Sequence, residues 1–175
     1  MTAAPPFTTA RLAMRALRVD DAAALHEAYG DPVAMRYWSS PPHRDVAETI
    51  DYIAPRPGHD PWCDWAITRR GDDRAIGTLA AGERRPCVVE IGYLLVPSAW
   101  GQGLAHEAVS ALVARLFHGG ARRLFADTDP DNVASNTLLE RLGFVREGLL
   151  RAEWETHIGV RDSVVWGLLR GEWSG

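Results

Sequence analysis

The fold is decided by the segment VVEIGYLLV at residues 88–96, which is followed by PSAWGQGLA at residues 97–105. The first part is rich in β-branched and aliphatic residues, has the length of a strand and is stopped by Pro97. Apolar residues then recur every four positions, at Leu104, Ala108, Leu112 and Leu116. This spacing predicts an amphipathic helix that runs from Leu104 to Phe117.

Two glycines, Gly101 and Gly103, join the predicted strand to the predicted helix. Glycine has no Cβ atom, so the backbone there can turn tightly or approach a ligand closely. The first N–H groups of a helix have no partner within the helix, and the helix dipole adds partial positive charge. We therefore expect a phosphate-bearing ligand at residues 102–105. A simpler interpretation, in which the glycines only shape the connection, stays open at this point.

Composition is that of an ordinary soluble globular protein, and 175 residues suit a single domain over residues 1–175. The net charge of −4 argues against non-specific nucleic-acid binding, which needs a basic surface. All 19 basic residues are arginine, which excludes a Schiff-base lysine and a P-loop lysine. No apolar run approaches the roughly 18–20 residues that span a bilayer. Cys63 and Cys87 form no CxxC motif, so we expect reduced thiols in a cytoplasmic protein.

Periodicity and turn residues predict an α/β fold with a central twisted mixed sheet of about seven strands and helices on both faces. Strands are expected at residues 11–15, 62–68, 75–81, 88–96, 123–127, 144–150 and 162–169, and helices at 20–29, 44–53, 104–117 and 133–142. Residues 55–61 are expected to form a loop, and residues 82–86 a turn between antiparallel strands. The strands at 88–96 and 123–127 enclose a helix, which implies a parallel crossover.

The order of these elements resembles the GNAT superfamily of acyl-coenzyme A-dependent N-acetyltransferases, and three local segments carry the resemblance. WGQGLA at residues 100–105 resembles the family's Gln/Arg-x-x-Gly-x-Gly/Ala pyrophosphate loop. DPDNVASN at 129–136 with LLERLGF at 138–144 resembles the later Asn-x-x-Ser…Leu-Gly-Phe segment. TARL at 9–12, together with EIGY at 90–93, looks like the branch that acetylates ribosomal-protein N-termini at alanine or serine.

The resemblance implies that acetyl-CoA is the cosubstrate and that a primary amine, such as a protein N-terminal α-amino group, attacks the thioester directly. It implies cofactor contacts at Leu94, Leu95 and Val96 beside the pantetheine, at Gln102, Gly103, Leu104 and Ala105 around the pyrophosphate, and at Asn132 on the pantetheine arm. Asn132 is also a good helix N-cap, and the two roles can coexist. Among arginines for the adenosine 3′-phosphate, the sequence does not rank Arg122, Arg123 and Arg141.

Glu90 is the first candidate for the general base, because it sits in an apolar strand where desolvation would raise the pKa of its carboxyl. The alternative is a strand-edge glutamate that points to solvent. Glu153, Glu155 and His157, between the last two strands, are the reserves. Ser135 is the first candidate for the donor that stabilises or protonates the departing thiolate, and its alternative is a solvent-facing serine near a helix cap.

Tyr37 and Trp38 are expected on the acceptor side, because this region varies with substrate in the family. The alternative is that they only cover the sheet. No metal is expected, since Ser110 stands where a His-Glu-x-x-His motif starting at His106 needs its second histidine. An amine acceptor is the expected partner, without nucleic acid or membrane, and the chain is expected as a monomer or homodimer.

Two other functions remain in view. A dinucleotide-binding oxidoreductase would use Gly101, Gly103 and Asp127, but His106 replaces the third glycine of its fingerprint. A non-catalytic acyl-CoA-binding or regulatory module on the same fold is the stronger alternative. It is favoured by the lack, after Asn132, of the tyrosine that many members of the superfamily use as a general acid.

Overall fold

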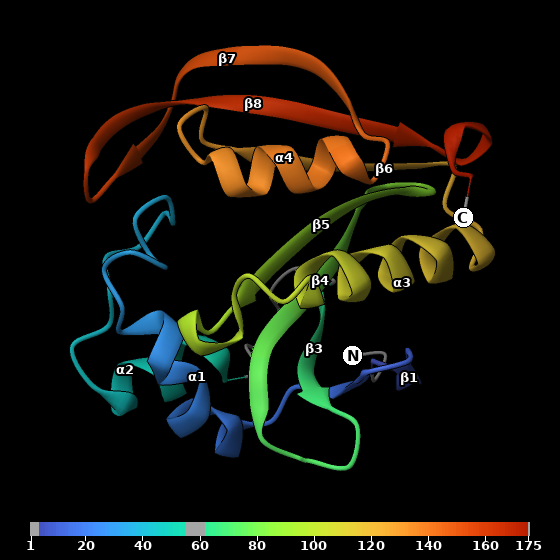
Figure 1. Ribbon diagram of the computed structural model, residues 1–175. Helices are drawn as coiled ribbons and strands as arrows, with labels where there is room; N and C mark the ends of the chain where they lie inside the picture. Colours follow the sequence, from blue (N-terminus) through green and yellow to red (C-terminus); the bar gives the residue numbers. More distant parts are fainter. Residues whose placement is uncertain (1–3, 55–61, 175) are drawn as a thin grey trace.

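The structure is a computed structural model that describes residues 4–54 and 62–174. Its strands are β1 (Phe7–Thr8), β2 (Leu12–Ala16), β3 (Trp62–Arg69), β4 (Ala75–Arg85), β5 (Val88–Leu95), β6 (Arg123–Thr128), β7 (Val145–Thr156) and β8 (Gly159–Leu169). Its α-helices are α1 (Ala22–Tyr29), α2 (Val46–Ile53), α3 (Leu104–His118) and α4 (Val133–Arg141) (Figure 1). This is the GNAT-like α/β arrangement expected from the sequence.

The eight strands form one sheet in the order β1-β2-β3-β4-β5-β6-β8-β7. Neighbouring strands are antiparallel except β5 and β6, which are parallel as the strand–helix–strand crossover requires. The β5–β6 pairing is short and covers Val88 with Arg123, Val89 with Leu124 and Glu90 with Phe125. Both strands continue beyond this point without pairing to each other, so the sheet opens there.

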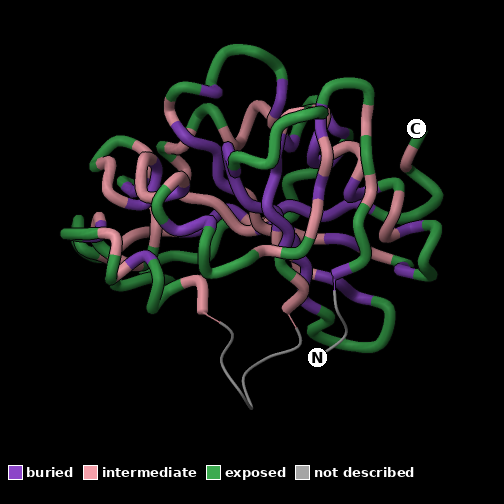
Figure 2. The backbone as a smooth tube through the Cα atoms, turned by 90° about the horizontal axis from the view of Figure 1, so that it is seen from below, coloured by how far each residue is buried: buried purple, intermediate pink, exposed green. Residues whose placement is uncertain are grey.

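The two faces of the sheet are covered by different helices. On one face, Tyr29 of α1 reaches Thr78 of β4, with 3.5 Å between their hydroxyl oxygens. The neighbouring Leu79 points to the other face, where the apolar side of α3 packs and Leu112 is fully buried. Buried segments gather in the middle of the molecule, and exposed segments surround them (Figure 2). The core therefore lies on both faces of the sheet, as the alternating strand pattern requires.

Several boundaries differ from the sequence-based expectation. The sheet has eight strands because the short β1 pairs with β2. The predicted turn at 82–86 is wrong, since β4 continues to Arg85. The chain reverses at Pro86 and Cys87, and the φ angle of Cys87 is +59°. Gly82 suggested a turn, but it lies in the strand because the Trp62 ring occupies the space of its missing side chain. The predicted loop at 55–61 lies outside the described residues.

None of the helices in the described ranges is long and apolar enough to cross a membrane.

Candidate active site

A long cleft starts where β5 and β6 separate. Beyond the Glu90–Phe125 pair, Ile91 to Leu95 have β4 on one side and no strand partner on the other. The Val96 N–H donates to the Ile76 carbonyl of β4, so by alternation the polar groups of Tyr93 and Leu95 face the opening. The indole N–H of Trp100 takes the Leu95 carbonyl, at 2.9 Å. The free edge of β5 can therefore bind an extended, amide-bearing ligand as an added strand would bind.

The N-terminus of α3 closes one end of the cleft. Gly101 and Gly103 have φ values of +71° and +72°, a left-handed conformation that side-chain-bearing residues adopt at a cost. Gly101, Gly103, Leu104 and Ala105 all line the cleft. In the described part of the chain, no hydrogen-bond acceptor takes the backbone N–H groups of residues 102–105. These free donors, together with the helix dipole, are the features of a helix start that can bind an anion.

Side chains from the residue before β2 and from the end of β3 fix the shape of this turn. Arg11 donates to the Gln102 carbonyl at 2.9 Å and forms an ion pair with Glu107 at 2.5 Å. Arg69 donates to the Gln102 side-chain oxygen at 2.8 Å, and the Gln102 amide donates to the Ser98 carbonyl. The Gln102 side chain thus holds the turn, while its backbone N–H stays available to a ligand.

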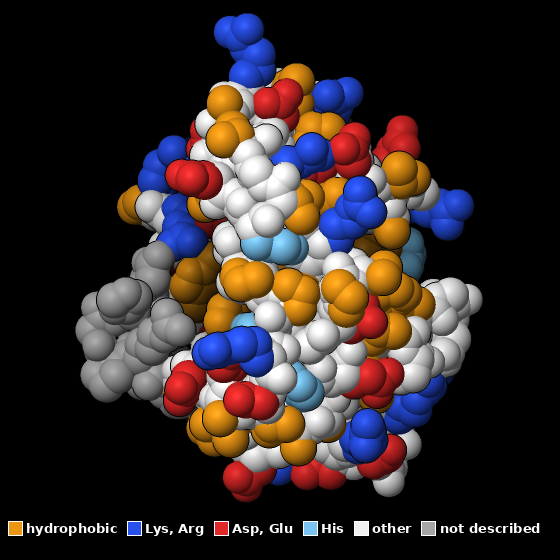
Figure 3. All heavy atoms as spheres, turned by 90° about the vertical axis from the view of Figure 1, so that its left-hand side faces the viewer, with side chains coloured by type: hydrophobic (Ala, Val, Ile, Leu, Met, Phe, Trp, Pro, Cys, Tyr) orange, Lys and Arg blue, Asp and Glu red, His pale blue; other side chains and the backbone are white. Residues whose placement is uncertain are grey.

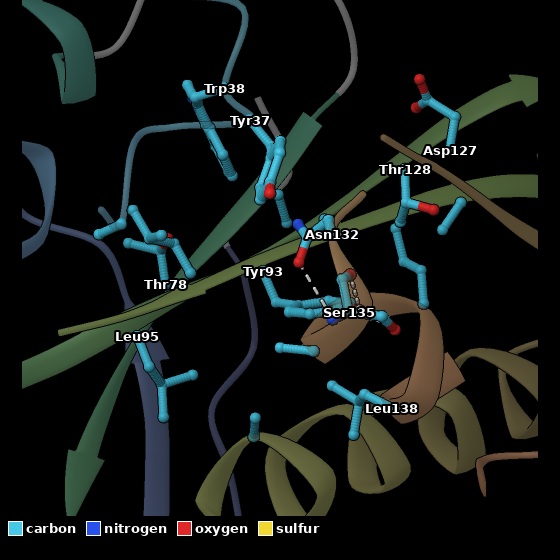
Figure 4. Close-up of a pocket in the computed structure, with 18 of the residues that line it drawn as sticks. Tyr37, Trp38, Thr78, Tyr93, Leu95, Asp127, Thr128, Asn132, Ser135 and Leu138 are labelled. Atoms are coloured by element: carbon cyan, nitrogen blue, oxygen red, sulfur yellow. Dashed lines mark hydrogen bonds between the residues drawn. The ribbon is translucent and has the colours of Figure 1, made fainter. Parts of the chain in front are cut away.

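Helix α4 borders the opening from the β6 side. Asn132 is its N-cap, and the Asn132 side-chain oxygen accepts from the Ser135 N–H at 3.2 Å (Figure 4). The capping interpretation of Asn132 is therefore confirmed. Its side-chain amide has no hydrogen-bond acceptor among the described residues, and both Asn132 and Ser135 line the cleft. The amide can still donate to a ligand, so capping and ligand contact are compatible.

Tyr93 is a site residue that the sequence reasoning missed. Its hydroxyl lies 2.6 Å from the Ser135 hydroxyl oxygen, and Figure 4 shows the two side chains meeting between β5 and α4. Desolvation raises the pKa of Tyr93 to about 12, although a hydrogen bond with Ser135 acts in the opposite direction. Tyr93 is therefore protonated at neutral pH. The available signal was the EIGY segment, which was interpreted as a family resemblance and not as chemistry.

Asn136, one residue after Ser135, faces the protein and not the cleft. Its amide nitrogen donates to the carbonyls of Asp129 and Pro130, each at 3.1 Å. Its oxygen accepts from Thr128 at 2.5 Å and from the Trp166 indole at 3.2 Å. All of these contacts tie the start of α4 to β6 and β8, which fixes the position of Ser135.

Glu90 lies at the last residue pair before the sheet opens, and its half-buried side chain lines the cleft. Its Oε2 atom accepts from the Arg84 guanidinium at 2.6 Å. Arg84 also lies over the Trp62 ring, with its central carbon 4.5 Å from the ring centre. The solvent-facing alternative for Glu90 does not describe this arrangement, since the carboxylate is held inside the cleft by an ion pair.

The segment after α1 and helix α2 form another wall of the cleft. Tyr37 and Trp38 line the cleft, and the Trp38 indole donates to the Tyr52 hydroxyl at 2.9 Å. Asp64 of β3 also faces this part of the cleft. Burial among the cleft walls raises the pKa of the Asp64 carboxyl even though much of the residue's surface is accessible to water. The sequence reasoning did not single out Asp64, because nothing in its local pattern separates it from a solvent-facing strand residue.

Other predicted residues lie elsewhere. Val96 is buried and its side chain does not line the cleft, nor do the side chains of Glu153, Glu155 and His157. Of the arginines considered for a 3′-phosphate, Arg141 lines the cleft. Arg123 is paired with Glu147, and Arg122 contacts the Pro86 carbonyl.

The cleft as a whole has a volume of about 1800 Å³. This exceeds the roughly 300–1,000 Å³ of a typical small-molecule site, so it offers room for a long ligand together with a second molecule. The face of the protein in Figure 3 carries a band of hydrophobic side chains across its middle, with charged side chains above and below it. The lining of the cleft differs along its length: backbone donors lie at the start of α3, and the aromatic residues Tyr37, Trp38 and Tyr52 lie near α1 and α2.

Comparison with known proteins identifies the family. Residues 11–145 match the model described as the acetyltransferase (GNAT) domain. An uncharacterized N-acetyltransferase of Bacillus subtilis, YoaA, is 33% identical over 156 residues, which cover 84% of this chain and 86% of the relative. The ribosomal-protein-serine acetyltransferase of Escherichia coli is 35% identical over 83 residues, 46% of each chain.

Solved structures agree with the sequence relatives. The crystal structure of a probable GNAT-family acetyltransferase from Chromobacterium violaceum superimposes with a TM-score of 0.89 at 27% identity, covering 99% of this chain and 91% of that one. A doubly wound dinucleotide-binding fold is excluded, because only β5 and β6 are parallel neighbours within the described sheet. The chain therefore belongs to the GNAT family and is an N-acetyltransferase.

Proposed function

We propose that this enzyme transfers the acetyl group of acetyl-CoA to a primary amine, of which a protein N-terminal α-amino group is one example, by direct attack on the thioester. GNAT enzymes use acetyl-CoA, and the residues present suit that ligand. The observation that carries the proposal is the single cleft that joins the α3 N-terminus, the free edge of β5 and the Ser135 hydroxyl. Diphosphate, pantetheine and thioester follow one another in the same order.

The cofactor would be held mainly by backbone groups. The N–H groups of residues 102–105 would bind the diphosphate, and the backbone N–H and carbonyl of Tyr93 with the N–H of Leu95 would bind the pantetheine amides. The Asn132 amide would donate to the same arm. Side chains of Leu94, Leu104 and Ala105 would contact the ligand's apolar parts. This assignment keeps the predicted residues except Val96, whose N–H is taken by β4.

The amine would approach from the face of the sheet that α1 covers, opposite the face on which the Tyr93 side chain lies. Side chains alternate along β5, so Glu90 and Gly92 face α1, whereas Tyr93 faces α3 and α4. An α-amino group has a pKa of about 7.7–8.0, and a large fraction is already neutral at slightly alkaline pH. A base therefore needs only to accept the proton directly or through one water. We assign this role to Glu90, whose Oε1 atom has no hydrogen bond within the described residues.

The departing thiolate needs a proton or a donor. Ser135 lies at the opening of the sheet, and Tyr93 can donate to its oxygen because the two are 2.6 Å apart. Ser135 would then direct its own proton towards the sulfur. In this scheme Tyr93 is a positioning residue, and the pair of hydroxyls replaces the general-acid tyrosine that α4 lacks.

The experiment is a coenzyme A release assay with acetyl-CoA and a panel of primary amines that includes short peptides with a free N-terminus. Release of one thiol per acetylated amine, confirmed by mass spectrometry of the product, is the expected result. Acetyl-CoA binding without turnover across the whole panel would instead support the non-catalytic module. NAD in place of acetyl-CoA serves as the ligand control and should not bind.

A further inference from the structure

The Asp64 carboxylate lies beside residues with small side chains on the acceptor face of the sheet. Strand register places Asp64, Ala80 and Gly92 side by side across β3, β4 and β5. These three residues project from the face that also carries Thr78, which contacts Tyr29 of α1. Because Ala80 has only a methyl group and Gly92 has no side chain, the space between Asp64 and the free end of β5 is open.

Packing does not require glycine at position 92. A Cβ atom built there would meet only the Ala80 methyl, at 3.9 Å, which is an ordinary contact. The Gly92 φ angle is not positive, so its backbone suits any residue. At Gly82, by contrast, a Cβ atom would lie 2.9 Å from the Trp62 ring. A side chain at position 92 would fit its backbone and project into the cleft, so its absence leaves room for a ligand.

Among the residues that the structure describes, Asp64 has no cationic partner in this open space. Its described neighbours include Leu17, just after β2, Ala80 on β4 and Tyr29 on α1, and none of these three carries a positive charge. Across residues 4–54 and 62–174, no side chain forms a hydrogen bond or ion pair with the Asp64 carboxylate. The raised pKa of Asp64 comes from desolvation alone, which is the situation that a bound cation would relieve.

The charged side chains that line the cleft are mostly negative, as Asp64 is. Six described carboxylate residues line it, Asp64, Glu90, Asp127, Asp129, Asp131 and Asp162, against three arginines, Arg84, Arg141 and Arg161. Arg84 is paired with Glu90, and Arg161 with Asp129 and Asp131. The described lining of the cleft is therefore negative overall, and Asp64 is a place where an additional positive charge can bind.

We propose that Asp64 binds a second cationic group of the acceptor, so that the enzyme selects primary amines that carry another positive charge. This inference rests on the proposed function and names its substrate class. β3 lies two strand spacings, roughly 10 Å, from β5, along which the thioester would lie. Asp64 is thus too distant to take a proton from the attacking nitrogen, which needs contact at about 3 Å. It suits the far end of a dicationic acceptor that crosses Ala80 and Gly92.

Two kinds of acceptor share this chemistry, an aliphatic diamine and a peptide whose second residue is basic. The test compares cadaverine with n-pentylamine, and a peptide beginning Ala-Lys with one beginning Ala-norleucine. For the wild type, kcat/KM should be at least about tenfold higher for the dication of the preferred pair, as loss of one charge-assisted contact implies. The two pairs distinguish the diamine source from the peptide source.

Asp64→Asn is the test variant, and Asp20→Asn, which makes the same charge change at an exposed residue outside the cleft, is its control. In Asp64→Asn the dication-to-monocation ratio should fall towards one, mainly through KM, and Asp64→Glu should restore part of it. Asp20→Asn should keep the wild-type ratio. A wild-type ratio near one for both pairs, or an unchanged ratio in Asp64→Asn, overturns the inference while turnover itself supports the proposed function.

A binding measurement makes the test independent of turnover. Titration calorimetry of cadaverine and of the Ala-Lys peptide into the coenzyme A-saturated protein should show binding that is about tenfold weaker in Asp64→Asn. Equal binding by Asp64→Asn and the wild type, or no binding of either dication by the wild type, refutes a cation site at Asp64. Absence of turnover with the site intact would refute only the proposed function.

Discussion

The Tyr93–Ser135 contact allows a sharp test of the proposed chemistry. Tyr93→Phe removes one hydroxyl and keeps the ring between β5 and α4. In the proposed scheme the half-buried Ser135 oxygen then loses the Tyr93 hydroxyl, its donor at 2.6 Å, and the Ser135 proton is no longer directed to the sulfur. Loss of one oriented hydrogen bond corresponds to about 1–2 kcal/mol, or roughly a 5–30-fold lower kcat. KM for acetyl-CoA should change little, because the backbone donors at α3 are untouched.

A double-mutant cycle separates a coupled pair from two independent residues. Ser135→Ala should lower kcat at least as much as Tyr93→Phe, since it removes the group next to the sulfur. If Tyr93 acts only through Ser135, adding Tyr93→Phe to Ser135→Ala should cause no further loss. The assay is thiol release at saturating acetyl-CoA and amine, with thermal melting to check folding.

Two results would refute this reasoning. One is an unchanged kcat in Tyr93→Phe, and the other is a double variant whose loss equals the product of the single losses. The pH profile adds a third criterion. Because the pKa of Tyr93 is about 12, the hydroxyl stays protonated to about pH 10, and an alkaline decline of kcat below that pH must have another origin.

Three further predictions concern the ends of the cleft. Gly103→Ala places a Cβ atom 3.7 Å from Arg11, an ordinary contact, but at φ +72°, so it should destabilise the fold by about 1–2 kcal/mol in urea unfolding and weaken coenzyme A binding in calorimetry. The control Gly120→Ala, at φ +106° and away from the cleft, should show the destabilisation alone. Equal binding losses in the two variants would contradict an anion site at the α3 turn. Asp129→Asn should lower the free energy of unfolding at pH 7 by about 1 kcal/mol, because the Arg161 guanidinium lowers the pKa of the Asp129 carboxyl. A lowered pKa in the folded state stabilises the fold at pH values above the pKa of the unfolded chain, so the difference between variant and wild type should close as the pH falls below roughly 4. A difference that stays constant across pH would count against the ion pair. Asn132→Asp should keep the α4 cap and, with it, the free energy of unfolding to within about 0.5 kcal/mol. It should raise KM for acetyl-CoA, because a carboxylate accepts hydrogen bonds but cannot donate one to the cofactor. An unchanged KM would remove Asn132 from the cofactor contacts.

Local patterns were enough for most of the framework. The β5 segment, its stop at Pro97 and the four-residue apolar spacing of α3 each depend on neighbours in sequence, so strand, turn and helix were predicted with the correct order and pairing sense. Sequence alone failed at Gly82, where a glycine served close packing of Trp62 and not a turn. It also missed the length of β7, because an exposed edge strand has no apolar alternation to mark it.

The candidate site divides in the same way. Residues 101–105 were predicted correctly as a helix start with free N–H groups, because glycine conformation and helix geometry are local properties. The partners of the catalytic candidates were not predictable. Arg84 reaches Glu90 across a β-bulge, and Tyr93 meets Ser135 across 42 residues of sequence. Such contacts depend on strand register and on where two strands separate.

The sequence by itself determined the order of elements, the glycine turn before α3 and the cap at Asn132, since each follows from the conformational preferences of a few adjacent residues. Only the tertiary structure decided that β5 and β6 part after Glu90 and that Tyr93 and Ser135 share a hydrogen bond on one face of the opening. It also decided that Asp64, on the other face, has no cationic partner among residues 4–54 and 62–174. The reason is physical: burial, charge pairing and hydrogen-bond distance are set by residues far apart in the chain, and they acquire values only when the sheet has formed.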